Sequence, residues 1–96
     1  MAYVSPKDVK SPRESWTLID VLFDGGEEST HALAVGEWEG RRCLAMRWNG
    51  TKDRPMGNPQ SRGIATWFIV PDDYNAVLIP TLSPEKQIIA KALLAQ

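Results

Sequence analysis

The alternation of apolar and polar residues predicts four β-strands in the first three quarters of the chain. Segment 15–24, SWTLIDVLFD, is rich in β-branched and aromatic residues, and its odd-numbered positions from Thr17 to Phe23 fall on one face. Segments 31–38 and 41–48 are predicted to pair as a hairpin, because the Glu-Gly dipeptide between them suits a tight turn. A fourth strand is predicted over 63–70, GIATWFIV.

Two helices are predicted after these strands. Pro71 suits a first helical position and is followed by two aspartates, while Pro80 ends this short helix. The second helix, 84–95, begins after a serine cap and carries an apolar stripe of Ile88, Ile89, Ala92 and Leu93. Strands followed by helices predict an α+β fold: a four-stranded antiparallel sheet followed by one short and one longer C-terminal helix.

The domain organisation follows from the same pattern. Residues 1–14 are polar and contain two prolines, so we expect a mobile N-terminal arm, and residues 15–96 are expected to form a single α+β domain. A 96-residue domain buries a limited share of its surface. The apolar stripe of the last helix exceeds what such a domain easily covers, so a homodimer is expected.

Amino-acid composition indicates the cellular compartment in which the protein is expected. Apolar residues make up 43% of the chain and charged residues 24%, which is ordinary for a globular protein. Cys43 is the only cysteine, so an internal disulfide is excluded. No apolar run reaches the roughly 20 residues of a membrane span, and the first residues lack the apolar core of a secretion signal. We therefore expect a cytoplasmic protein without a membrane partner.

The net charge of −1 conceals an uneven distribution. Residues 1–40 hold three basic and eight acidic side chains, whereas 41–63 hold six basic side chains and a single aspartate. Residues 64–96 hold two basic and three acidic side chains. The middle of the chain is therefore a basic block inside a nearly neutral protein.

Within this block, residues 49–63 form a long polar segment between two apolar ones. Loops of this length in compact domains are usually functional or disordered. Pro55 and Pro59 lower the entropy cost of ordering it, and Met56 offers one apolar anchor. We expect the half nearest Gly63 to be ordered and the loop to form the rim of a binding surface.

Catalytic chemistry finds little support in the sequence. His31 is the only histidine and Cys43 the only thiol, and a cysteine nucleophile needs a base within hydrogen-bond reach. Cys43 lies between apolar residues at a position that suits a small core side chain. No spacing of ligands suggests a metal site, and no phosphate-loop motif is present. We expect no catalytic residues, no metal, no cofactor and no enzymatic activity.

Basic residues interleaved with aromatic ones point instead to binding. Such a surface can hold single-stranded nucleic acid, because cations follow the phosphates while bases stack on the rings. Tryptophan and arginine are equally enriched in protein interfaces, so a protein–protein interaction or adaptor module is the alternative, and small-molecule binding or a purely structural loop also remains open. The candidate binding residues are Arg41, Arg47, Trp48, Lys52, Arg54, Arg62 and Trp67.

Residues 38–78 contain a hairpin ending in Gly40-Arg41, the strand RRCLAMRW, a basic loop, the tetrapeptide SRGI, a strand and a helix. This order resembles the single-stranded DNA-binding domain of the transcriptional positive cofactor family, and more loosely the plant Whirly proteins. The resemblance implies dimerisation through the helix and a curved sheet that holds single-stranded DNA. By position it implies contacts from Arg41, Arg47, Trp48 and Arg62. Two features differ from that family: the first forty residues are acidic, and the strand after Gly63 is longer.

Overall fold

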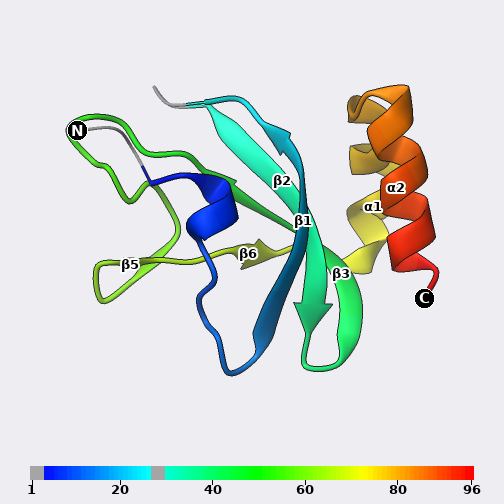
Figure 1. The fold of residues 1–96 in the computed structure, drawn as a ribbon, viewed down its shortest axis with the longest axis horizontal. Coiled ribbons are helices and arrows are strands. Elements are labelled where there is room, and N and C mark those ends of the chain that lie inside the picture. The colour runs from blue at the N-terminus through cyan, green and yellow to red at the C-terminus, as the bar shows by residue number, and fades with distance from the viewer. Residues whose placement is uncertain (1–3, 27–29) are drawn as a thin grey trace.

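The computed structural model describes residues 4–26 and 30–96. They form three layers, of which the middle one is a β-sheet (Figure 1). The sheet is antiparallel, with strand order β1-β2-β3-β6. Figure 1 shows helices α1 and α2 on one side of it, and the N-terminal segment and the hairpin of β5 on the other. We call these two sides the helix face and the tryptophan face. The α+β fold with a four-stranded antiparallel sheet and two C-terminal helices is thereby confirmed.

The strands of the main sheet are β1 (Trp16–Asp24), β2 (His31–Trp38), β3 (Arg41–Trp48) and β6 (Phe68–Ile69). A separate two-stranded sheet pairs β4 (Gln60–Ser61) with β5 (Ile64–Ala65). The helices are α1 (Asn75–Leu78) and α2 (Pro84–Leu94), and the 3-10 turns are η1 (Pro6–Asp8), η2 (Asp72–Tyr74) and η3 (Ile79–Thr81).

The turn between β2 and β3 forms as its sequence predicts. Glu39 and Gly40 have φ values of 51° and 83°, the left-handed pair that a two-residue type I′ hairpin requires. This turn fixes an uninterrupted register in which His31 lies opposite Trp48 and Trp38 lies opposite Arg41.

Strand β1 departs from simple alternation. Its register against β2 shifts between Leu18 and Asp20 and again between Val21 and Phe23. Each irregularity inserts one residue, and a one-residue slip moves the following side chains to the other face. Val21 therefore lies opposite Ala34 on the tryptophan face and Phe23 opposite Leu33 on the helix face. The prediction that the odd-numbered residues share one face was wrong, because these irregularities cannot be seen in the period-two pattern.

Both faces of the sheet are covered, which gives two cores. The tryptophan face presents small side chains, which leave room for Trp16 and Trp67 with ring centroids 6.5 Å apart. Its buried residues are Val9, Trp16, Ala32, Ala34, Cys43, Ala45, Ala65 and Trp67. The helix face presents larger aliphatic side chains, and its buried residues are Leu22, Leu33, Val35, Leu44, Val70, Ile79, Leu82 and Ala90.

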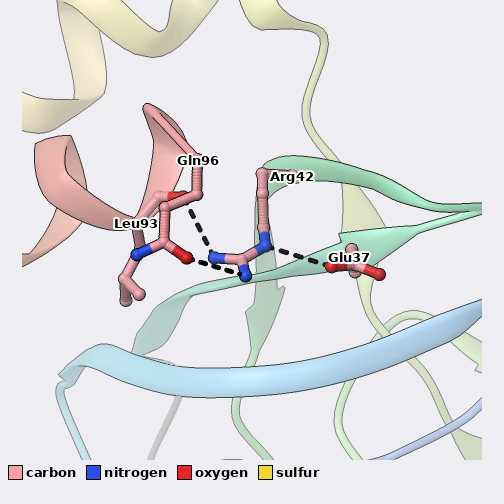
Figure 2. Close-up of polar contacts among 4 residues, drawn as sticks. All are labelled: Glu37, Arg42, Leu93 and Gln96. Carbon is pink, nitrogen blue, oxygen red and sulfur yellow. Dashed lines mark hydrogen bonds and ion pairs between the residues drawn. The ribbon is translucent and has the colours of Figure 1, made fainter.

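Arg42 ties the C-terminal helix to the sheet, as Figure 2 shows. Its Nε donates to Glu37 Oε2 at 3.1 Å, and its Nη1 and Nη2 donate to Leu93 O at 3.1 Å and to Gln96 Oε1 at 3.2 Å. A cation at the end of α2 also favours the negative end of the helix dipole. Two of these hydrogen bonds hold the C-terminal end of α2 and the residues after it against β3, and the third joins β3 to β2.

The predicted serine cap of α2 is present, whereas its apolar stripe lies on other residues than predicted. The hydroxyl of Ser83 accepts a hydrogen bond from the Lys86 N–H at 3.3 Å, so the serine cap is confirmed. The stripe is rotated from the expected one. Ala90 is buried, and Ile89, Leu93 and Leu94 pack against the helix-face core, whereas Ile88 is exposed.

Residues 4–14 pack against the rest of the protein, although an N-terminal arm was expected to be mobile. Val9 is buried in the tryptophan-face core, and its carbonyl accepts a hydrogen bond from Trp67 Nε1 at 2.6 Å. Val4 N donates to Pro55 O at 2.9 Å. Apolar residues inside a polar segment therefore anchor it to the sheet and to the loop. Residues 1–3 of the expected arm lie outside the described part.

The segment 63–70 does not form the one continuous strand predicted from its composition. Arg62 and Gly63 have φ values of 53° and 78°, so they close a tight hairpin that pairs β5 with β4. The chain then turns Trp67 into the tryptophan-face core before Phe68 and Ile69 join β3.

In the described part of the chain, no helix is long and apolar enough to cross a membrane.

Candidate binding surface

An exposed cluster of aromatic side chains lies on the helix face, at the end of the sheet that the helices leave open. Strand register places it there, since Leu33 lies opposite both Phe23 and Met46, and Met46 lies opposite Phe68. His31 and Trp48 face each other two residues further along their strands, so their side chains project from the same face. We call these five residues the aromatic patch: Phe23, His31, Met46, Trp48 and Phe68.

Three rings of the patch, those of Phe23, His31 and Trp48, lie next to one another and remain open to solvent. The ring centroids of Phe23 and His31 are 4.9 Å apart, and those of His31 and Trp48 are 6.4 Å apart in an edge-to-face arrangement. Trp48 is 58% exposed and Phe68 55% exposed. Neighbouring large rings that are this accessible are typical of interaction surfaces.

Two hollows meet at Trp48. The larger, of 510 Å³, lies over the patch and is lined by His31, Met46, Arg47, Trp48, Asn58, Pro59 and Phe68. The smaller, of 340 Å³, lies under the loop and is lined by Trp48, Asn49, Thr51, Arg54, Gly57 and Asn58. Trp48 and Asn58 belong to both, so an aromatic hollow adjoins a second hollow that is lined by loop residues, among them the cation Arg54.

The loop 49–63 is held beside this surface by its own backbone. Trp48 N donates to Asn58 O at 2.7 Å and Asn58 N donates to Trp48 O at 3.1 Å, which joins the loop to the end of β3. Gly57 has a φ of 61°, and a Cβ there would collide with the backbone of Trp48. A tight turn between Thr51 and Arg54 shapes the tip. These contacts give the loop a defined path beside the end of β3.

Arg47 is a buried residue that holds this loop. It is 3% exposed, and its guanidinium donates to the carbonyls of Thr66 and Met56. Burial lowers the pKa of the Arg47 guanidinium. Its side chain projects to the tryptophan face, because Arg47 lies opposite Ala32. The residue is therefore placed to fasten the loop to β3, and its guanidinium is turned away from the aromatic patch.

Trp67 is also internal, at 4% exposure, with its indole N–H donated to Val9. Of the seven candidate residues, Trp48 and Arg54 line the same hollow, and Lys52 is exposed in the loop between them in sequence. Arg41 lies at the opposite end of β3, roughly 23 Å from Trp48 at about 3.3 Å per residue, where it forms an ion pair with Asp72. Arg62 is exposed at the tip of the β4–β5 hairpin.

Cys43 and His31 are not neighbours. Cys43 lies opposite Gly36 on the tryptophan face, whereas His31 lies at the far end of β2 on the helix face. Burial raises the pKa of the Cys43 thiol, which disfavours the nucleophilic thiolate. Among residues 4–26 and 30–96, no group of three His, Cys, Asp or Glu side chains is placed to hold a metal ion.

Sequence reasoning did not select five residues of this surface as binding residues: Phe23, His31, Met46, Asn58 and Phe68. The hairpin turn at Glu39-Gly40 contains the signal for His31, since counting back from it puts His31 opposite Trp48. Phe23 and Phe68 depend on the irregular register of β1 and on the pairing of β6, for which the sequence has no local signal.

Comparisons with protein-family models, with curated proteins and with solved structures gave no match. The resemblance to the transcriptional positive cofactor family therefore remains a prediction. Of the four contact residues that it implies, only Trp48 belongs to the aromatic patch.

Proposed function

We propose that this protein is a non-enzymatic binding module for single-stranded nucleic acid, with the aromatic patch and the 49–63 loop as its binding surface. The observation that carries the proposal is the position of Trp48. Its exposed ring stands between an aromatic hollow and a second hollow whose lining includes the cation Arg54. A nucleotide has two parts that match these hollows: a flat base that can stack on the rings and an anionic phosphate that a cation attracts.

The physical argument has two parts. A base stacked on an exposed aromatic ring is worth about 1–3 kcal/mol, and every base has a face that can stack. Lys52 and Arg54 lie in the adjoining loop, exposed and outnumbering the single Asp53 between them, so phosphates passing there are attracted. Duplex bases are already stacked on one another, and the surface therefore favours single strands.

A protein partner is the second candidate, because Phe23 and Met46 extend the apolar part of the patch beyond His31, Trp48 and Phe68. Aromatic residues and methionine are enriched in protein interfaces, and such a contact would use apolar burial with little help from Lys52 or Arg54. The two candidates differ in their response to salt. Nucleic-acid affinity falls steeply with salt concentration, whereas an aromatic-anchored protein contact responds far less.

The test measures binding of a fluorescent single-stranded oligonucleotide at several salt concentrations. We expect Trp48→Ala to weaken binding by about tenfold or more, since a lost base stack costs about 1–3 kcal/mol. Arg54→Ala should weaken it less and should reduce the slope of log affinity against log salt by about 0.7, the value for one phosphate on a single strand.

Arg41→Ala is the matched control, because Arg41 is an exposed arginine at the far end of the same strand. It should leave binding within about twofold, as expected for a group beyond a Debye length of about 10 Å. An oligonucleotide affinity that is indifferent to Trp48→Ala, or equal for Arg41→Ala and Arg54→Ala, would contradict the proposed surface.

We also propose a homodimer formed through the C-terminal helices. Tyr74, Val77 and Ile88 are exposed apolar side chains on this layer, and a second copy would remove them from water. Light scattering at high micromolar concentration is expected to give twice the monomer mass, and Ile88→Glu to reduce it. A monomeric mass for the unmodified protein would remove this proposal without touching the aromatic patch.

A further inference from the structure

Two residues, Trp48 and Asn58, line both hollows. Besides the indole N–H of Trp48, the amide of Asn58 is the hydrogen-bonding side-chain group that they share. Asn58 is exposed, and among the described residues none forms a hydrogen bond with its side-chain amide. Asn49, nearby in the loop, is the contrast. It is buried, and its Nδ2 donates to Asp24 Oδ1 at 2.9 Å and to Gly26 O at 2.7 Å. One amide thus supports the fold, while the other faces the binding surface.

The backbone of Asn58 is held firmly beside Trp48. The two residues exchange both backbone hydrogen bonds as an antiparallel pair, so their side chains project from the same face. The preceding Gly57 is packed against the backbones of Trp48 and Asn49, and Pro59 follows directly. The amide is therefore presented from a fixed point next to the ring.

From this placement we infer that Asn58 is a specificity-determining residue that reads the edge of the base stacked on Trp48, with adenine preferred. The inference rests on the proposed function. A pocket lined mainly by apolar side chains gains orientation and selectivity from a few placed polar groups. An asparagine amide offers a donor and an acceptor side by side, which match the N6 amino group and N7 of adenine in a bidentate pair.

A structural role for the Asn58 side chain would require internal partners, and the described residues supply none. The backbone bonds that hold the loop survive substitution by alanine. Asn58→Ala is therefore expected to remove the reading group and to leave the loop and the melting temperature unchanged.

The experiment uses single strands of about nine nucleotides, within the range of sites on small binding domains. All positions are abasic except three central ones, which carry adenine, cytosine, guanine or thymine. We expect the adenine strand to bind the full chain at least about fivefold more tightly than the other three, since a bidentate pair gives about 1–3 kcal/mol of discrimination. In Asn58→Ala the four affinities should lie within about twofold of one another.

Lys52→Ala serves as the control, because loss of a phosphate contact weakens all four strands alike and preserves their order. Equal affinities for the four strands in the unmodified protein, or an adenine preference that survives Asn58→Ala, would overturn the inference while leaving the proposed function intact. Preference for another base that disappears in Asn58→Ala would overturn the choice of adenine. Strands that fail to bind, or bind without regard to Trp48, would overturn the proposed function itself.

Discussion

Replacing Trp67 by alanine should lower the free energy of unfolding by about 3–5 kcal/mol, the range for removing a large buried aromatic side chain. Trp67 packs with Trp16 in the tryptophan-face core and connects it to the N-terminal segment through the bond to Val9. A small domain has a total stability of about 5–15 kcal/mol, so this loss is a large part of it. Urea unfolding followed by far-ultraviolet circular dichroism measures the change.

Trp48→Ala is the matched control for this prediction, since it removes the same side chain from an exposed position. It should lower the free energy of unfolding by about 1 kcal/mol or less, in keeping with a surface change near one packed loop, yet abolish most oligonucleotide binding. Trp67→Phe retains most of the ring but leaves the Val9 carbonyl without its donor, so an intermediate loss is expected. Equal stabilities for the two alanine variants would contradict the assignment of one tryptophan to the core and the other to the surface.

Arg47→Ala is expected to lower the free energy of unfolding by about 2–6 kcal/mol, because two part-buried carbonyls lose their donors at about 1–3 kcal/mol each. The same substitution frees the segment around Met56 from β3, so the loop beside Trp48 loses a fastening. Oligonucleotide affinity should therefore fall too, although the guanidinium projects from the opposite face. Thermal unfolding and oligonucleotide titration of the same preparation measure both effects.

Arg54→Ala separates loop support from ligand contact. Arg54 is exposed, so its loss should leave the free energy of unfolding within about 0.5 kcal/mol while weakening binding. Arg47→Lys keeps the positive charge but lacks the planar fork that reaches two carbonyls at once, and we expect it to rescue only part of the stability. An Arg47→Ala variant with unchanged stability and reduced affinity would instead make Arg47 a ligand contact.

Local sequence signals determined a large part of this fold. The Glu39-Gly40 turn, the serine cap before Pro84 and the order of strands and helices each depend on residues close together in the chain. Such features can be predicted because turn and cap preferences arise from the conformations of a few neighbouring residues. The basic character of the loop and its position beside Trp48 also follow from the sequence.

Tertiary structure alone decided which of these residues face the solvent. Trp48 and Trp67 flank the same loop, and Arg47 and Arg54 lie seven residues apart, yet one member of each pair is buried and the other exposed. Residue type cannot separate them, because the outcome depends on the register between strands and on what covers each face. The two irregularities of β1 and the short pairing of β6 bring Phe23 and Phe68 beside His31 and Trp48. Long-range pairing of this kind has no signature in any single segment, and so the aromatic patch emerged only once the strands were assembled.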